Sequence, residues 1–188
     1  MKRIAIFASG NGSNAKAIIQ YFQGNKNIRI ETIVCNNPKA KVIEVARELN
    51  IPCRLITRQD LYIEDDILNF LKASHIDLIV LAGFLWLIPE KLLSAFPDKI
   101  INIHPALLPK FGGKNMYGNR VHESVLNAGE KETGITIHLL NEKYDEGKIK
   151  FQKTCAIDSS DSAEDISRKV QKLEHEWYPK IIEGILTS

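Results

Sequence analysis

The run Leu78-Ile79-Val80-Leu81-Ala82 constrains the fold of this chain most strongly, because it is apolar without a break. A strand with one face in water alternates apolar and polar residues, whereas an unbroken apolar strand is covered on both faces. Such strands belong to parallel sheets with helices packed on each side. Other short apolar runs alternate along the chain with segments of helical periodicity. The sequence therefore predicts an α/β fold with a mainly parallel, twisted sheet flanked by helices.

The spacing of apolar residues and the glycine and proline breaks predict the individual elements. Predicted strands cover 4–8, 28–35, 54–56, 78–82, 100–103, 134–140 and 149–156. Predicted helices run from the turn at 9–13 to residue 22 and over 39–49, 60–73, 89–95 and 120–128. A last helix begins at Ser162, with Asp165 at capping-box spacing. Only a short turn joins the last two strands, so we expect them to be antiparallel, within a single domain over 1–188.

Composition and charge argue against several classes of function. The chain has 25 lysines and arginines against 23 aspartates and glutamates, which is too balanced to indicate nucleic acid or an anionic membrane as a partner. No apolar run reaches membrane-spanning length, and no signal-peptide core follows the N-terminus. Cys35, Cys53 and Cys155 have neither metal-binding nor redox spacing. We expect three unpaired thiols in a cytoplasmic protein, with Cys35 and Cys53 as small core residues.

The segment Asn102-Ile103-His104-Pro105 carries the strongest chemical signal. Residues i and i+2 of a strand point to the same face, so Asn102 and His104 should converge where the strand ends. Pro105 lacks an N–H group and cannot continue the ladder. A neutral donor beside a titratable group can stabilise and protonate an oxyanion. The alternative from these residues alone is a strand end whose histidine caps a loop.

The turn Ser9-Gly10-Asn11-Gly12-Ser13-Asn14 lies between the first strand and the first helix. Backbone N–H groups at such a helix start form an anion site, unless Ser13 or Asn14 caps the helix instead. Ala15 stands where a dinucleotide-binding fingerprint often has its third glycine. No acidic residue follows the second strand to bind a ribose diol. These features favour a phosphate monoester over NAD.

Five motifs resemble, in the same order, those of the phosphoribosylglycinamide formyltransferases, a branch of the folate-dependent formyltransferases. They are Gly10-Asn11-Gly12-Ser13-Asn14, Leu81-Ala82-Gly83-Phe84, Asn102-Ile103-His104-Pro105, Leu107-Leu108-Pro109 and Asp145-Glu146-Gly147. The resemblance implies a Rossmann-like formyltransferase fold. It also implies direct transfer of a formyl group from 10-formyltetrahydrofolate to the amine of phosphoribosylglycinamide, without a metal. Small molecules would be the partners, and the protein would be a monomer or a homodimer.

The resemblance also implies roles for individual residues. The implied catalytic residues are Asn102, His104 and Asp145, the last of which would raise the pKa of His104. The implied ribonucleotide-binding residues are Gly12, Ser13, Asn14, Gln171 and Glu174. The implied folate-binding residues are Leu85, Trp86, Leu87, Ile88, Asn102, Asn141, Glu142, Lys143, Tyr144 and Asp145.

Some residues depart from the pattern of this family. Trp86 stands where many members have a basic or polar residue, and Lys148 stands where proline is usual. The loop 112–119 is longer than in many relatives, and no role is carried over within it. An arginine that some relatives place near position 60 has no aligned partner, because Asp60 stands there and Arg58 is only nearby.

The other histidines have less specific settings. His75 should be solvated, and His122 should lie on the surface of its helix. His175 is expected to pack or to support the site rather than to catalyse. Strand alternation places His138 opposite to Ile137, which leaves it open between the core and the active site.

Three other functions compete with this assignment. A methionyl-tRNA formyltransferase would carry a C-terminal RNA-binding domain, and a formyltetrahydrofolate hydrolase would carry an N-terminal regulatory domain. We expect neither in this chain. A dinucleotide-dependent dehydrogenase is the third alternative, and it leaves the Asn-x-His-Pro block unexplained.

Overall fold

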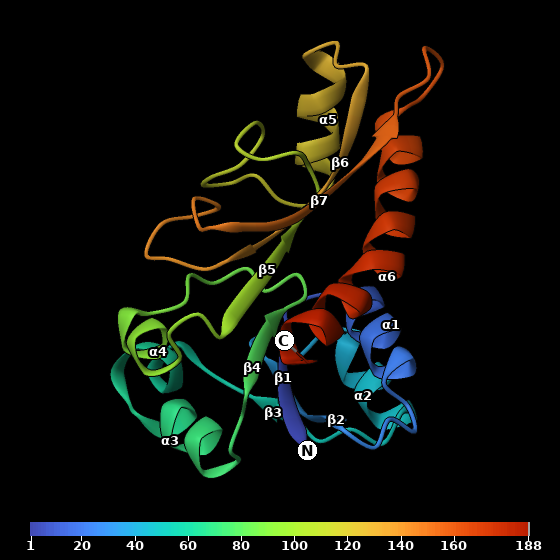
Figure 1. Ribbon diagram of the computed structural model, residues 1–188. Coiled ribbons are helices and arrows are strands. Elements are labelled where there is room, and N and C mark those ends of the chain that lie inside the picture. Colours follow the sequence, from blue (N-terminus) through green and yellow to red (C-terminus); the bar gives the residue numbers. More distant parts are fainter. Residues whose placement is uncertain (188) are drawn as a thin grey trace.

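The structure is a computed structural model, which describes residues 1–187. A seven-stranded sheet forms the centre of the protein (Figure 1). The strands lie in the order β3-β2-β1-β4-β5-β6-β7. They are β1 Lys2–Ala8, β2 Ile28–Cys35, β3 Cys53–Leu55, β4 Leu78–Leu81, β5 Ile100–His104, β6 Glu132–Leu139 and β7 Ile149–Ala156. The pairs from β3 to β5 are parallel, and β6 is antiparallel to both neighbours. The predicted mainly parallel sheet and the antiparallel pairing of the last two strands are confirmed.

Helices cover both faces of this sheet. They are α1 Ser13–Tyr21, α2 Val42–Glu48, the π-helix η1 Gln59–Ile63, α3 Asp66–Ala73, α4 Glu90–Ala95, α5 Asn119–Asn127 and α6 Ala163–Thr187. In Figure 1, α1, α2 and the long α6 lie on one side of the sheet, and α3 and α4 lie on the other. Successive side chains of a strand point to opposite faces, so β1 contributes to both layers. Ile4 and Ile6 pack with the first layer, and Ala5 and Phe7 pack with the second.

The central strand β4 is buried along its whole length, as its unbroken apolar sequence predicts. Cys35 at the end of β2 is fully buried in the core, and Cys53 and Cys155 are half-buried against the same core. All three cysteines are free thiols.

The start of α6 shows the capping signal in full. The Asp165 N–H donates to the Ser162 hydroxyl oxygen at 3.2 Å, and the Asp165 carboxylate accepts the Ser162 N–H at 3.0 Å. This reciprocal pair satisfies donors that the first helical turn leaves free, as the sequence predicts. Pro89 differs slightly from expectation, because it precedes α4 in an extended conformation rather than occupying its first turn.

The single predicted helix over 60–73 is wrong, because the segment forms η1 and α3 with a break between them. Glu64 is extended, with ψ 161°, and ends η1. The break falls in Glu64-Asp65-Asp66, where consecutive acidic residues are poorly suited to a helix interior and well suited to a helix start.

Parallel strands β1, β4 and β5 end at the same edge of the sheet, where the strand order reverses between β1 and β4. Ligands of open α/β sheets bind in the crevice at this place. Tyr178 of α6 is fully buried and donates a hydrogen bond to the Leu81 carbonyl at 2.9 Å, so the helix is fixed across the strand ends.

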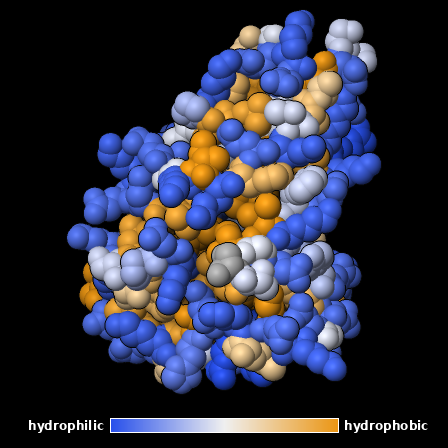
Figure 2. Space-filling view, viewed as in Figure 1, coloured by the Kyte–Doolittle hydropathy of each residue, from blue (hydrophilic) through white to orange (hydrophobic). Residues whose placement is uncertain are grey.

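The surface is mixed in character. Figure 2 shows apolar side chains gathered across the middle of one face, in the region where Figure 1 places β4 and β5, with polar side chains above and below. None of the helices within residues 1–187 combines the length and the apolar character that crossing a membrane requires.

Candidate active site

A cavity of about 540 Å³ lies at the carboxyl edge of the sheet. Its walls come from the turn after β1, the segment after β4, the end of β5, the loops at 113–119 and 144–145, and α6. The site residues expected from the sequence that line it are Ser13, Asn14, Leu85, Asn102, His104, Tyr144, Asp145, Gln171 and Glu174. Side chains from distant parts of the chain therefore share one cavity.

His104 and Asp145 form the centre of this cavity. The His104 side chain is buried, and its Nδ1 lies 3.4 Å from Asp145 Oδ2. Its other nitrogen, Nε2, donates to the Phe111 carbonyl oxygen at 2.8 Å. Both ring nitrogens face acceptors, and only the imidazolium form donates from both. These two acceptors therefore favour a protonated ring.

Burial acts against that charge. Burial is the largest influence on His104 and lowers its pKa, whereas the Asp145 carboxylate and the Phe111 carbonyl raise it. Asp145 acts in the direction expected from the sequence, but the net pKa of His104 still lies below its ordinary value. Burial raises the pKa of Asp145, but hydrogen bonding to His138 and the charge of His104 outweigh it, so the net pKa is lowered. Asp145 is therefore ionised at neutral pH.

His138 belongs to the site, which the sequence leaves open. It is buried on β6, where its Nδ1 donates to the Leu139 carbonyl at 3.0 Å. Its Nε2 lies 3.3 Å from Asn102 Nδ2 and 3.5 Å from Asp145 Oδ1. The Nε2 atom therefore lies between the Asn102 amide and the Asp145 carboxylate. His138 thus contacts both Asn102 and Asp145.

The loop 105–119 contributes backbone groups that the sequence does not reveal. Besides the Phe111 carbonyl, the Gly113 N–H donates to Asp145 Oδ2 at 2.9 Å. A Cβ at Gly112 would lie 3.2 Å from Asp145 Cβ, so the chain passes directly over the carboxylate. The signal in the sequence is the pair Gly112-Gly113, which permits this approach.

The start of the same loop is fixed by a buried hydroxyl. Thr136 Oγ1 on β6 accepts the Leu108 N–H at 3.0 Å and donates to the Ala106 carbonyl at 2.7 Å. Gln152 on β7 donates to the Leu108 carbonyl at 3.0 Å. These bonds hold the chain that follows His104.

The first turn of α1 is open for an anion. Neither Ser13 nor Asn14 caps the helix, so the capping alternative from the sequence does not apply. Ser13 Oγ instead accepts from Gln171 Nε2 at 3.3 Å, and Asn14 Nδ2 donates to Glu174 Oε2 at 3.0 Å. Gly12 does not line the cavity, but its φ of 76° requires a glycine, and a Cβ there would lie only 2.7 Å from Val42 Cγ2.

Glu174 faces the cavity from α6, one turn after Gln171. Burial raises its pKa to about 7, although the hydrogen bond from Asn14 lowers it. The carboxyl group therefore exchanges a proton near neutral pH, unlike an ordinary exposed glutamate.

Of the residues that the resemblance assigns to folate binding, some line the cavity and others lie in the core or on the surface away from it. Leu85 and Tyr144 are exposed and line the cavity. Ile88 is buried in the core beside α3 and α4, and Trp86 packs against that core with the Arg58 guanidinium 4.8 Å from its ring centre. The Leu87 carbonyl accepts from Tyr62. Asn141, Glu142 and Lys143 are exposed and lie outside the cavity wall.

The loop that leads to Asp145 is closed by its backbone. The Leu139 N–H donates to the Lys148 carbonyl at 2.9 Å. Gly147 fits tightly, because a Cβ there would lie 1.7 Å from the Leu139 carbonyl oxygen. With lysine at 148 in place of proline, this backbone hydrogen bond still joins the two ends of the loop.

The prediction for His122 is wrong, because its side chain is buried and lines the cavity. Its helix α5 packs against α6, so the face with His122 turns inward with Val121 and Val125. His75 is exposed as predicted. His175 is half-buried on α6 and lies outside the cavity wall.

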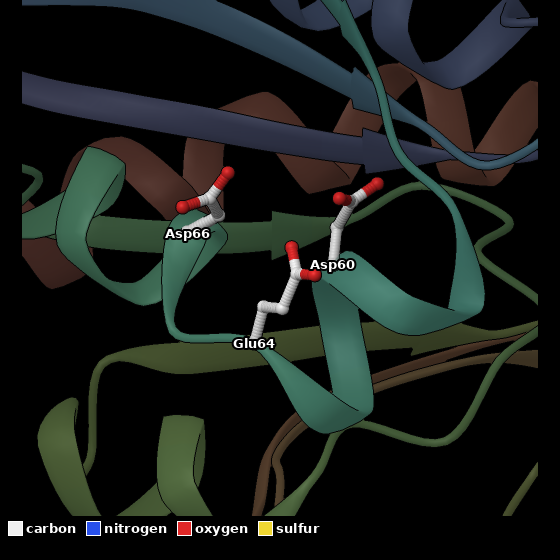
Figure 3. Close-up of side chains that lie close together, drawn as sticks. All are labelled: Asp60, Glu64 and Asp66. Carbon is white, nitrogen blue, oxygen red and sulfur yellow. The ribbon is translucent and has the colours of Figure 1, made fainter.

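A group of carboxylates lies elsewhere, where Asp60, Glu64 and Asp66 approach within 4.8 Å (Figure 3). Asp60 accepts hydrogen bonds from the N–H and the hydroxyl of Thr57, and Asp66 lies 3.9 Å from the Arg54 guanidinium. These contacts account for two of the three acids as parts of a local turn and a surface ion pair.

The cavity brings Asn102 and His104, at the end of β5, together with Asp145 from the loop between β6 and β7. This arrangement defines a candidate group-transfer enzyme of the α/β class. The sequence profile of the formyl transferase family matches residues 2–182. The chain therefore belongs to the formyl transferase family.

Individual relatives show which members of the family the chain is similar to. The phosphoribosylglycinamide formyltransferase of Bacillus subtilis is 41% identical over 191 residues, which cover 99% of this chain and 95% of the relative. The crystal structure of glycinamide ribonucleotide transformylase 1 from Geobacillus kaustophilus has a TM-score of 0.89 at 38% identity and covers 99% of both chains. Phosphoribosylglycinamide formyltransferase from Bacillus halodurans has a TM-score of 0.88 at 35% identity, over 100% of this chain and 96% of the other.

Proposed function

We propose that this member of the formyl transferase family is a phosphoribosylglycinamide formyltransferase of purine biosynthesis. In the proposed reaction, the formyl group of 10-formyltetrahydrofolate passes to the amine of phosphoribosylglycinamide. The meeting of Asn102, His104 and Asp145 in one cavity carries the proposal. Relatives of that name, which match along nearly the whole chain, support it.

The cavity fits a phosphorylated acceptor at one end. The uncapped first turn of α1 offers N–H groups to a phosphate, and the helix dipole favours the negative charge. Gln171 and Glu174 bound the cavity on the α6 side and would hold the ribose and the glycyl amine. The exposed Leu85 and Tyr144 provide apolar area for the folate donor. The residues 1–188 would act as a single domain.

Glu174 prepares the acceptor amine. An α-amine has a pKa of about 8 and is mostly protonated at neutral pH, but only the free amine attacks a carbonyl carbon. The Glu174 carboxylate can bind the ammonium group and, because burial raises its pKa to about 7, can accept its proton. That proton then passes to water.

Asn102 and His104 act on the donor, which supplies a formyl carbon attached to nitrogen N10. As the amine nitrogen bonds to this carbon, the carbonyl electron pair moves to oxygen, where the Asn102 NH₂ group donates a hydrogen bond. When the bond from carbon to N10 breaks, its electron pair remains on N10 and His104 donates a proton there. The proton lost by the attacking amine restores the imidazolium.

Asp145 and His138 position these two groups. Asp145 offsets the burial of His104 and keeps the protonated ring accessible. His138 lies 3.3 Å from the Asn102 amide nitrogen and positions that carboxamide. The Phe111 carbonyl accepts the Nε2–H of His104, so the N10 atom of the donor must take the place of this oxygen for proton donation from Nε2.

Turnover with 10-formyl-5,8-dideazafolate and phosphoribosylglycinamide tests the proposal, since deformylation of this folate is followed by absorbance. We expect turnover only when both compounds are present, and its loss in His104→Asn. Deformylation without the amine would indicate a hydrolase, and formylation of methionyl-tRNA would indicate the other transferase. Either result would overturn the assignment.

A further inference from the structure

One residue of the long loop lines the active-site cavity and has no role so far. Among the cavity-lining residues within 1–187, Lys114 is the only lysine or arginine. The same wall carries the carboxyl groups of Asp145 and Glu174. A doubly charged phosphate entering this cavity would therefore meet one permanent side-chain cation.

The position of Lys114 is set by the residue before it. The Gly113 N–H is hydrogen-bonded to Asp145, so the chain is held at the catalytic carboxylate immediately before Lys114. Gly113 has a φ of 99°, which a residue with a side chain rarely adopts, and the chain turns there. The Lys114 side chain then projects from a fixed point at the cavity wall.

The Lys114 ammonium group is also free to bind a ligand. Lys114 is exposed, and within residues 1–187 its ammonium group makes no hydrogen bond or ion pair. Lys110 of the same loop, by contrast, is paired with Glu130 at 2.8 Å. An unpaired surface lysine is ordinary in itself, but one at the wall of a phosphate-binding cavity is available to the ligand.

The helix start alone leaves most of the phosphate charge unbalanced. A phosphate monoester carries about −1.5 to −2 charges at neutral pH, whereas a helix N-terminus supplies about half a positive charge. We propose that Lys114 is the cationic ligand of the ribonucleotide phosphate and binds it from the loop while the first turn of α1 binds it from the sheet side. This inference rests on the proposed function, since it names a further residue for the same acceptor.

The variant Lys114→Met tests this role, with Lys110→Met as a control on the same loop. We expect KM for phosphoribosylglycinamide to rise about tenfold in Lys114→Met, the loss of one charge-assisted contact. The KM for the folate donor and kcat at saturation should stay within about twofold, and Lys110→Met should behave as the wild type. Lys114→Arg should recover much of the affinity.

The dephosphorylated acceptor, glycinamide riboside, separates a phosphate contact from a general effect on the loop. Wild type and Lys114→Met should use it equally well, because the group that Lys114 binds is missing. An equal loss with both acceptors, or an unchanged KM for the ribonucleotide, would overturn the inference. Calorimetric binding of ribose 5-phosphate gives the same comparison without turnover, so failure of the proposed function would be seen separately.

Discussion

The substitution Asp145→Asn removes one charge from the centre of the cavity and leaves the shape of the side chain. Asp145 Oδ2 lies 3.4 Å from His104 Nδ1, and both side chains are largely buried. Two unit charges about 4 Å apart interact by about 4 kcal/mol at an effective dielectric constant of about 20. Each 1.36 kcal/mol corresponds to about a tenfold change in rate, so this value sets an upper limit near a thousandfold. We expect kcat to fall by roughly 10²–10³.

Steady-state kinetics over pH measure this effect. The carboxylate raises the pKa of His104, so its removal lowers that pKa further. A general acid works only when protonated, and the high-pH loss of activity should therefore begin at lower pH in the variant. The KM values should change little. The control Glu146→Gln removes an exposed carboxylate that pairs with Lys143, and it should retain full activity. A kcat for Asp145→Asn within about threefold of wild type would refute the role of Asp145.

Three further substitutions test the binding of the ribonucleotide, the position of the cavity segment at Leu85 and the packing of β6 against β7. In Glu174→Gln, KM for the ribonucleotide should rise. The raised pKa of the Glu174 carboxyl means that the wild-type protein loses stability as pH rises through about 7. Thermal unfolding above pH 7 should therefore show the variant to be more stable than wild type. Ser9→Ala leaves the Leu85 N–H without its 3.0 Å acceptor and should cost about 1 kcal/mol in urea unfolding, with a larger rise in KM for folate than for the ribonucleotide. In Gly134→Ala, the new Cβ would lie 1.9 Å from the Lys153 carbonyl oxygen, and separating β6 from β7 should cost about 1–3 kcal/mol, whereas the unhindered Gly184→Ala should be neutral or stabilising.

The parts of the fold with short-range signals are predictable from the sequence. The unbroken apolar run at β4, the run of β-branched residues in β6 and the Ser162–Asp165 cap each depend on neighbouring residues. The convergence of Asn102 and His104 follows in the same way from strand periodicity.

Contacts between distant segments are not encoded in that way. The burial of His122 depends on the packing of α5 against α6, which no periodicity within its own helix reveals. The Phe111 carbonyl and the Gly113 N–H are backbone groups, so residue identity carries almost no sign that they bind His104 and Asp145. Asp145 itself would pass for a turn residue without the family resemblance. The net pKa of His104 depends on burial, which only the folded chain defines.

Nitrogen-15 NMR of the histidine rings measures the protonation of His104 directly. Its signal is assigned by its absence in His104→Asn, and the ring is titrated in wild type and in Asp145→Asn. We predict that the wild-type ring has a pKa below the ordinary histidine value and that the substitution lowers it further. A His104 pKa that is the same in both proteins would contradict the claim that the Asp145 carboxylate stabilises the charged ring.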